Sequence, residues 1–530
     1  MSTHVGEVDP ATGSDHRPSA RGPALSGVLA TAAGLAVTEA AARLLPLVPS
    51  PLDALGQVLV SWLPGPVVTA AIELLGAANR AVLLLASVLV ALLLGAAVGR
   101  LGARSYAGAV GAITVVGLVA VLATATQPGA ALPLVLLVVL AGGAVTAGLL
   151  ARLLRLLGRL PAPIPALPSP TDPPVDRRGF LRLGGATAAG AAGLGLLSRW
   201  DSRGGATALE DATRPAPRAA APLPAVPASQ DLATRVADVT PALTPTDRFF
   251  RIDTAVVLPR VDVATWQLRV TGLVERELVL TYDDLLARDL VEVDATIACV
   301  SNEVGGDLIG TARWTGVPLV ELLDEARPTR AAEQVLGRSV DGFTAGFPLE
   351  LAREGRDALV AVAMNGETLP LRHGFPARLV VPGLFGYVSA TKWLADIELT
   401  RWEGVDGYWI PRGWSKRGPV KTGARIDRPG RGEQVPAGEV VVAGVAWAPT
   451  RGISRVEVLL DGAVVAEATL VEPLSRSTWV QWYAPIEVPP GGHRLTVRAT
   501  DGTGAVQAEG PAPPAPDGAE GWPTLRIEAV

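Results

Sequence analysis

The sequence predicts three parts in order: a multi-span α-helical membrane region, an α+β domain and an Ig-like β-sandwich. Hydrophobic residues make up 49% of the 530 residues, and their excess is concentrated in the first two hundred. Strand and helix patterns then alternate to about residue 400, and only short strand patterns follow residue 438. We expect a membrane region over 1–200, a linker over 201–240, the α+β domain over 241–425 and the sandwich over 426–530.

Long apolar runs indicate the membrane spans, because about 20 apolar residues cross a bilayer. Residues 105–151 contain no charged residue and are long enough for two spans, and 81–98 and 25–45 supply two more. The stretch 55–77 is interrupted by two prolines, so it is either a kinked span or an interfacial segment. We favour a span, which gives about five in total.

Arginine positions predict the orientation. Arg100 and Arg104 lie in one loop, and five arginines including Arg177 and Arg178 lie in the next, two spans later. Both loops should therefore face the cytoplasm. The pair Arg177-Arg178, ahead of a Gly/Ala-rich stretch to Leu197, resembles an internal twin-arginine export signal, although it also fits the positive-inside pattern alone. With export, the soluble half would lie outside the cytoplasmic membrane.

Charge and histidine content exclude other functions. The net charge of −5 argues against a nucleic-acid partner. The four histidines, His4, His16, His373 and His493, all lie outside the predicted spans, and no Cys-x-x-Cys-His motif occurs. We therefore expect no haem in this chain. The membrane region could then anchor the chain in lipid, contact a quinone or dock a separate redox partner.

Local patterns define the soluble elements. Residues 266–273 alternate like a half-buried strand, Thr281 begins a helix as its cap, and 291–298 reads as a strand that ends at Cys299. Towards the C-terminus, strand patterns at 440–447, 456–462 and 493–500 are joined by Asp-Gly turn signals, which fit a small sandwich.

Cys299 is the only cysteine, so it cannot form an intramolecular disulfide, and packing, metal ligation or nucleophilic chemistry remain. It lies in Ala295-Thr-Ile-Ala-Cys-Val-Ser-Asn302. An ordered series of motifs follows: Gly310-Thr-Ala-Arg-Trp314, Met364-Asn-Gly366, Arg372-His-Gly-Phe-Pro-Ala-Arg378, Val381-Pro-Gly383 and Thr391-Lys-Trp-Leu394. From about Leu243 to Val530, the chain resembles the molybdopterin-binding sulfite oxidase family.

The resemblance implies a molybdenum-molybdopterin cofactor with Cys299 as the metal ligand. Oxygen-atom transfer on a small-molecule substrate would then cycle the metal between two oxidation states. A thiolate suits this role because it is a strong, soft donor. Asn302 would orient the ligand from nearby. A β domain in this position mediates dimerisation in the family, so a homodimer through the C-terminal domain is implied.

The organic part of the cofactor carries a phosphate, which fixed donors must meet. Arg378 can bind it bidentately, Lys392 can act as a point charge and Ser389 can add a hydroxyl. Gly386 lets the backbone approach closely. The resemblance implies that His373 hydrogen-bonds the pterin. Arg251, beside Asp253, matches a cofactor-contacting segment of the family more loosely.

The sequence departs from sulfite oxidases after the cysteine. They carry a basic pair where this chain has Glu303 and Val304 after Asn302. An acid there would repel sulfite, so an S-oxide or N-oxide is favoured over sulfite itself. Arg313 is either structural or faces the substrate, and with Cys299 and Glu303 it completes the catalytic candidates.

Two other classes compete with an oxygen-transfer enzyme. One is an enzyme with Cys299 as nucleophile and His373 as base, against which the phosphate-binding pair Arg378 and Lys392 argues. The other is a binding module that kept the fold without the cofactor, which the intact motif series disfavours.

Overall fold

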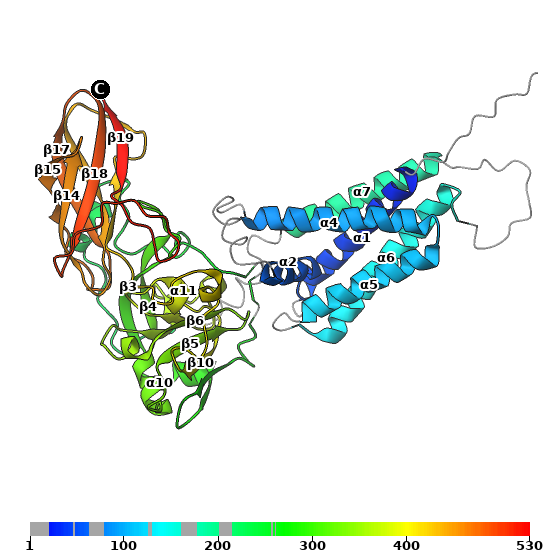
Figure 1. Cartoon of the computed structure of the whole chain (residues 1–530), viewed down its shortest axis with the longest axis horizontal. Helices are drawn as coiled ribbons and strands as arrows, with labels where there is room; N and C mark the ends of the chain where they lie inside the picture. Colours follow the sequence, from blue (N-terminus) through cyan, green and yellow to red (C-terminus); the bar gives the residue numbers. More distant parts are fainter. Residues whose placement is uncertain are drawn as a thin grey trace, which may run out of the picture. The chain divides into compact units, whose positions relative to one another are not determined.

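A computed structural model describes residues 21–45, 48–62, 79–125, 130–160, 177–200, 215–255, 258–259 and 261–530. The chain divides into a helical unit, within residues 1–58 and 78–203, and a second unit that contains residues 204–530 (Figure 1). The helices of the first unit are α1 (Arg21–Leu44), α2 (Pro51–Trp62), α4 (Asn79–Gly102), α5 (Tyr106–Ala125), α6 (Leu132–Leu156) and α7 (Arg177–Trp200).

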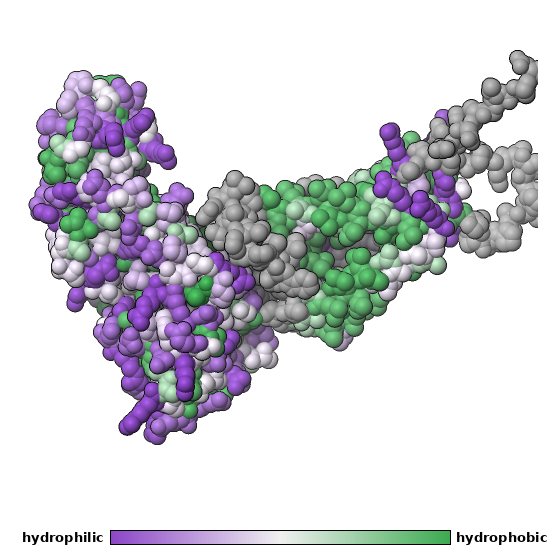
Figure 2. Space-filling view, viewed as in Figure 1, coloured by the Kyte–Doolittle hydropathy of each residue, from purple (hydrophilic) through white to green (hydrophobic). Residues whose placement is uncertain are grey.

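Four of these helices are long and apolar enough to cross a membrane: α1, α4 from Val82, α5 and α6. Hydrophobic residues cover most of the visible length of this unit, and hydrophilic residues gather at one end (Figure 2). Exposed leucines such as Leu85 and Leu140, at 67% and 69%, are expected for side chains that face lipid. Four of the predicted spans therefore match apolar helices.

Glycines set the packing of α1. Gly27 lies directly against Gly95 and Gly99 of α4, and Gly34 lies against Gly142 and Thr146 of α6. Close approach of backbones through small residues is the usual basis of helix association in membranes. The order of these contacts makes α1 antiparallel to both α4 and α6.

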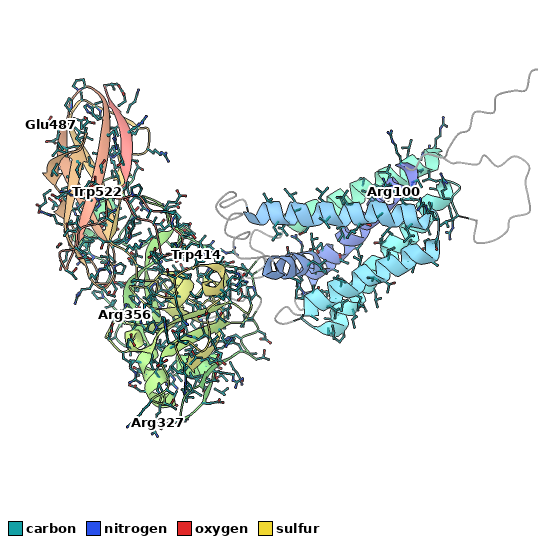
Figure 3. All side chains as sticks on the ribbon, viewed as in Figure 1. Arg100, Arg327, Arg356, Trp414, Glu487 and Trp522 are labelled. Atoms are coloured by element: carbon teal, nitrogen blue, oxygen red, sulfur yellow. The ribbon has the colours of Figure 1, made fainter. Side chains whose placement is uncertain are left out.

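This packing locates the arginines. The start of α1 lies beside the ends of α4 and α6, so Arg100 and Arg155 belong to one end of the bundle (Figure 3 labels Arg100). α7 begins at the same end, and Gly184 packs on Leu29 of α1. α1 ends and α4 begins at the opposite end, and the span expected over 55–77 stays a prediction. Residues 63–78 of that stretch lie outside the described residues.

Two sheets form the α+β part of the second unit. One has the order β2-β1-β10-β5-β6, and the other has β3-β4-β7-β8 with β9 paired to β7. Their bounds are β1 (Gln267–Gly272), β2 (Leu278–Thr281), β3 (Val291–Ala298), β4 (Ile309–Pro318), β5 (Gln334–Ser339), β6 (Thr344–Pro348), β7 (Leu359–Met364), β8 (Glu367–Thr368), β9 (Arg378–Val380) and β10 (Leu394–Thr400). Three short helices join them: α9 (Tyr282–Leu286), α10 (Leu319–Ala326) and α11 (Gly386–Ser389).

Local sequence signals appear where expected. The β3 strand has the predicted bounds 291–298. At α9, the Thr281 hydroxyl accepts from the Asp284 backbone N–H while the Asp284 carboxylate accepts from the Thr281 N–H, which forms a capping box.

The C-terminal part consists of two facing sheets. One has the order β11-β13-β17-β16 and the other β12-β19-β18-β14-β15. Their bounds are β11 (Gly423–Arg428), β12 (Gln434–Val435), β13 (Gly438–Trp447), β14 (Ile453–Leu460), β15 (Ala463–Glu467), β16 (Thr469–Leu470), β17 (Val480–Val488), β18 (Gly491–Asp501) and β19 (Thr524–Ala529). Val442 and Trp482 of one sheet share a core with Val458 and Val497 of the other. This is a β-sandwich, and its Ig-like class remains a prediction.

The predicted linker is partly folded. Leu232 is buried with Ala443 and Val471 of the sandwich, and its N–H donates to Gln481 Oε1 at 2.8 Å. The Leu223 N–H donates to the Glu292 carboxylate at 2.7 Å. Residues 215–240 therefore lie along the second unit, within the range that the sequence assigns to a linker.

The glycine packing of α1 predicts a stability difference. At Gly99, a Cβ would meet the Pro23 carbonyl and the Gly27 backbone, whereas nothing lies within 4 Å of a Cβ at Gly148. Gly99→Ala should therefore destabilise the bundle by about 1–3 kcal/mol, whereas Gly148→Ala should be neutral or slightly stabilising. Thermal unfolding in detergent measures both, and equal midpoints would contradict the packing.

Candidate active site

A short loop holds Cys299 at the end of β3. The Cys299 N–H donates to the Leu308 carbonyl at 2.9 Å, and the Asn302 N–H donates to the Cys299 carbonyl at 3.1 Å. Asn302 Oδ1 accepts from the Leu308 N–H at 2.8 Å, so this side chain closes the loop on itself. Cys299 is half-buried, and burial of its thiol raises the pKa, while hydrogen bonds from Ser301 and the charge of Lys392 oppose the shift.

The α11 helix lies beside this loop. A Cβ at Gly386 would lie 3.7 Å from the carbonyl oxygen of Ala298, so the first residue of α11 borders the end of β3. Ser389 is buried in the last turn, and its hydroxyl donates to the Phe385 carbonyl at 3.0 Å. In this arrangement the hydroxyl proton of Ser389 points at the α11 backbone, and its oxygen can accept a further hydrogen bond.

His373 has one free ring nitrogen. It ends the 3-10 turn Leu371–His373 and is 1% exposed. Its Nε2 lies 3.1 Å from the Thr246 carbonyl, so this nitrogen carries the proton, and the buried Nδ1 has no partner among the described residues. Burial, with the charges of Arg378 and Lys392, lowers the pKa of His373 to about 3. The imidazole is therefore neutral, with an acceptor pointing at no protein donor.

Arg378 is a buried cation on β9, 4% exposed. Its Nη1 donates to the His373 carbonyl at 3.1 Å, and its guanidinium lies 4.9 Å from the Trp314 ring centroid. Within the described part of the chain, no carboxylate lies within ion-pair distance of it. Burial lowers its pKa to about 10. Because a buried charge without a counterion is unfavourable, this position favours an anionic ligand.

Lys392 adds a second buried cation. Its Nζ donates to the Ile252 carbonyl at 3.0 Å and lies 3.3 Å from Asp253 Oδ2. Burial lowers its pKa to about 8, Asp253 acts against this, and Arg378 and Arg251 lower it further. Arg251 Nε also donates to Asp253, at 2.8 Å. Arg251 and Lys392 therefore share one carboxylate, and with Arg378 nearby the site carries an excess of positive charge.

Gly374 brings the two buried cations together. Its φ is +115°, and a Cβ would lie 3.0 Å from Lys392 Cβ and 3.1 Å from Arg378 Cβ. Only glycine combines this backbone angle with such a close approach. Gly374 had no role assigned from sequence, although it lies in the motif that contains His373 and Arg378.

A strap formed by residues 244–253 covers this cluster. Asn365 Nδ2 donates to the Thr244 carbonyl at 3.0 Å and to Thr246 Oγ1 at 3.2 Å, which fixes the carbonyl that binds His373. Phe249 packs edge-on against His373, with ring centroids 5.7 Å apart. Asn365 is thus a further site residue, and the Met364-Asn-Gly366 motif was its only signal.

Two catalytic candidates lie elsewhere. Arg313 pairs bidentately with Asp294 at 2.8 Å and donates to the Pro224 carbonyl at 2.8 Å. It lies opposite Asp294, five residues before Cys299, or about 16 Å along the strand. Arg313 therefore anchors residues 215–227 rather than facing the thiol. Glu303 is exposed and borders a cavity between the loop after Cys299 and the sandwich.

Comparison with known proteins decides the family. Residues 255–409 match the family described as "Oxidoreductase molybdopterin binding domain". The uncharacterized oxidoreductase YuiH of Bacillus subtilis is 35% identical over 159 residues, which cover 30% of this chain and 76% of that protein. The chain belongs to the sulfite oxidase family of molybdopterin-dependent oxidoreductases.

Longer relatives match less completely. Human mitochondrial sulfite oxidase is 30% identical over 320 residues, or 51% of this chain and 58% of that protein. The chain thus spans just over half the length of this curated relative. The sulfane dehydrogenase SoxCD of Paracoccus pantotrophus, a solved structure, has 22% identity and a TM-score of 0.48, and the match covers 62% of this chain and 91% of that chain.

The residues present fit a molybdopterin. The matched region contains Cys299, His373, Arg378 and Lys392, and Arg251 lies just before it. The uncompensated cations suit a phosphate, and the free Nδ1 of His373 suits an N–H donor of the pterin. A molybdenum cofactor is therefore implied for this family member.

The depressed pKa of His373 predicts a pH effect. Because the unfolded chain binds this proton near pH 6.5 and the folded chain only near pH 3, folding stability should fall as the pH drops through that window. His373→Asn keeps an N–H donor without the titration. We expect the variant to have a lower unfolding midpoint than the wild type at pH 7, and the difference between the two midpoints to narrow by pH 4. Thermal unfolding measures this, and a constant difference would contradict a depressed pKa.

Proposed function

We propose that this oxidoreductase is membrane-anchored and transfers an oxygen atom from a small S-oxide or N-oxide. The observation that supports a cofactor-dependent reaction is the positive cluster of Arg251, Arg378 and Lys392 around one carboxylate, next to the half-buried Cys299. Reduction of an S-oxide consumes two electrons and two protons and yields a sulfide and water. The electrons would come from a separate redox partner or a membrane quinone.

The chain's residues would hold the cofactor in defined roles. Arg378 and Lys392 bind the phosphate, and His373 Nδ1 accepts a hydrogen bond from the pterin. Cys299 supplies the metal ligand after loss of its proton, which burial opposes and the Lys392 charge assists. When bound, the molybdenum cofactor supplies two-electron oxygen-atom transfer.

Sulfite oxidation and thiol catalysis are the alternatives. Glu303 disfavours a sulfite dianion near the loop. For thiol catalysis, His373 would act as the base through Nδ1, but burial and the neighbouring cations lower its pKa to about 3, which makes it a weak base. The oxygen-transfer proposal uses every unusual group of the cluster, whereas thiol catalysis leaves Arg378 unexplained.

The helix directions support an extracytoplasmic catalytic unit. With the arginine end of the bundle in the cytoplasm, α1 starts there and α7 starts there again. If α7 crosses as a fifth span, the residues that follow it emerge on the opposite side. Its twin-arginine start then serves as the export signal for a domain folded beforehand.

The proposal includes two assembly features that rest on family resemblance. The C-terminal sandwich would form a homodimer, and a separate redox partner would dock to the second unit. The net charge of −5 gives no reason to expect a nucleic-acid partner.

The decisive experiment measures molybdenum and released pterin in purified full-length protein. We expect near-stoichiometric amounts in the wild type, lost activity in Cys299→Ser, and at least about tenfold less pterin in Arg378→Gln, because a buried charged hydrogen bond to phosphate is lost. Arg353→Gln, at an exposed ion pair with Asp324, is the matched control and should stay loaded. Folded wild type free of metal and pterin, from a host that makes the cofactor, would refute the proposal.

A further inference from the structure

A cavity lies between the loop after Cys299 and the C-terminal sandwich. Its volume is about 390 Å³. Ala298, Asn302 and Glu303 form part of the wall, and Phe385 and Trp447 contribute apolar surface. Ala298 directly precedes Cys299 in the chain, and Asn302 and Glu303 follow it within four residues. A ligand in the cavity would contact the loop that holds the thiol.

The basic groups on the wall already have acidic partners. Lys421 pairs with Asp517 at 3.1 Å and with Glu520 at 2.8 Å. Arg451 pairs with Asp501 at 2.8 Å, and Asp501 is only 2% exposed. Neither cation is available to an incoming anion without breaking these pairs.

Glu303 is the exception on this wall. Its side chain is exposed, and its carboxylate makes no hydrogen bond or ion pair with any described residue. Its backbone is fixed, because the Gly306 N–H donates to the Glu303 carbonyl at 2.9 Å. The wall therefore presents one uncompensated negative charge beside aromatic surface, which attracts cations and repels anions.

We propose that this cavity binds the cationic end of a small organic molecule, with Glu303 as the specificity-determining residue. This inference rests on the proposed function and names its substrate class: an S-oxide or N-oxide that also carries an ammonium or sulfonium group. Glu303 holds the cation, and Phe385 and Trp447 contact its alkyl groups. Sulfite is excluded by charge rather than by size.

Tetramethylammonium is a simple probe of the cavity. Isothermal titration of the full-length protein in detergent should show saturable binding of tetramethylammonium chloride and none of sodium sulfate at equal ionic strength. Glu303→Gln should weaken tetramethylammonium binding at least about tenfold, since one close charge pair is lost. Glu321→Gln, at an exposed carboxylate on α10, is the matched control and should bind as the wild type does.

Absent cation binding in the wild type, or equal binding in Glu303→Gln, would overturn the inference. The inference would also be overturned if tetramethylammonium binds but does not raise the KM for the cationic S-oxide or N-oxide substrate, because the cavity would then not be the substrate site. Molybdenum and pterin are measured in the same samples. If the protein lacks the cofactor but still binds the cation, the proposed function is refuted and the cation-binding site stands. Fully loaded protein without cation binding would refute the cavity alone.

Discussion

The site depends on an imbalance of buried charge. Arg251 and Lys392 pair with one carboxylate, Asp253, and the buried Arg378 pairs with no carboxylate among the described residues. Burial lowers the pKa of Arg378 to about 10 and that of Lys392 to about 8, which shows how unfavourable their charged forms are here. A phosphate would relieve this unfavourable energy. Burial, together with the charges of Arg378 and Lys392, also lowers the pKa of His373 and keeps its imidazole neutral.

The scaffold keeps these groups close with Asp253 as their one counterion in the described part of the chain. Gly374 lets the Arg378 and Lys392 backbones approach, and Trp314 lies against the Arg378 guanidinium. Asn365 holds the strap whose Thr246 carbonyl fixes the His373 tautomer. The arrangement is therefore ready for a ligand before it arrives, which reduces the cost of ordering on binding.

Sequence predicted the features that depend on local order. Each of these features depends on only a few neighbouring residues: the strand that ends at Cys299, the cap at Thr281 and the motif that contains His373 and Arg378. The role of Arg313 was not readable, because its partner Asp294 is set by the register of β3 and β4. Likewise, Leu232 is buried by Ala443 and Val471, which lie more than 200 positions further along the chain. Pairings across such separations leave no local pattern.

The separation of the site residues also constrains assembly. The strap, the Cys299 loop, the His373 turn and Lys392 come from segments spread over roughly 150 residues. No binding site for a cofactor exists before these segments fold together, so cofactor binding would stabilise the folded state through linkage. Under the proposed extracytoplasmic placement, a cofactor loaded in the cytoplasm would require the domain to cross the membrane already folded. The export proposal assigns the signal to the pair Arg177-Arg178 at the start of α7.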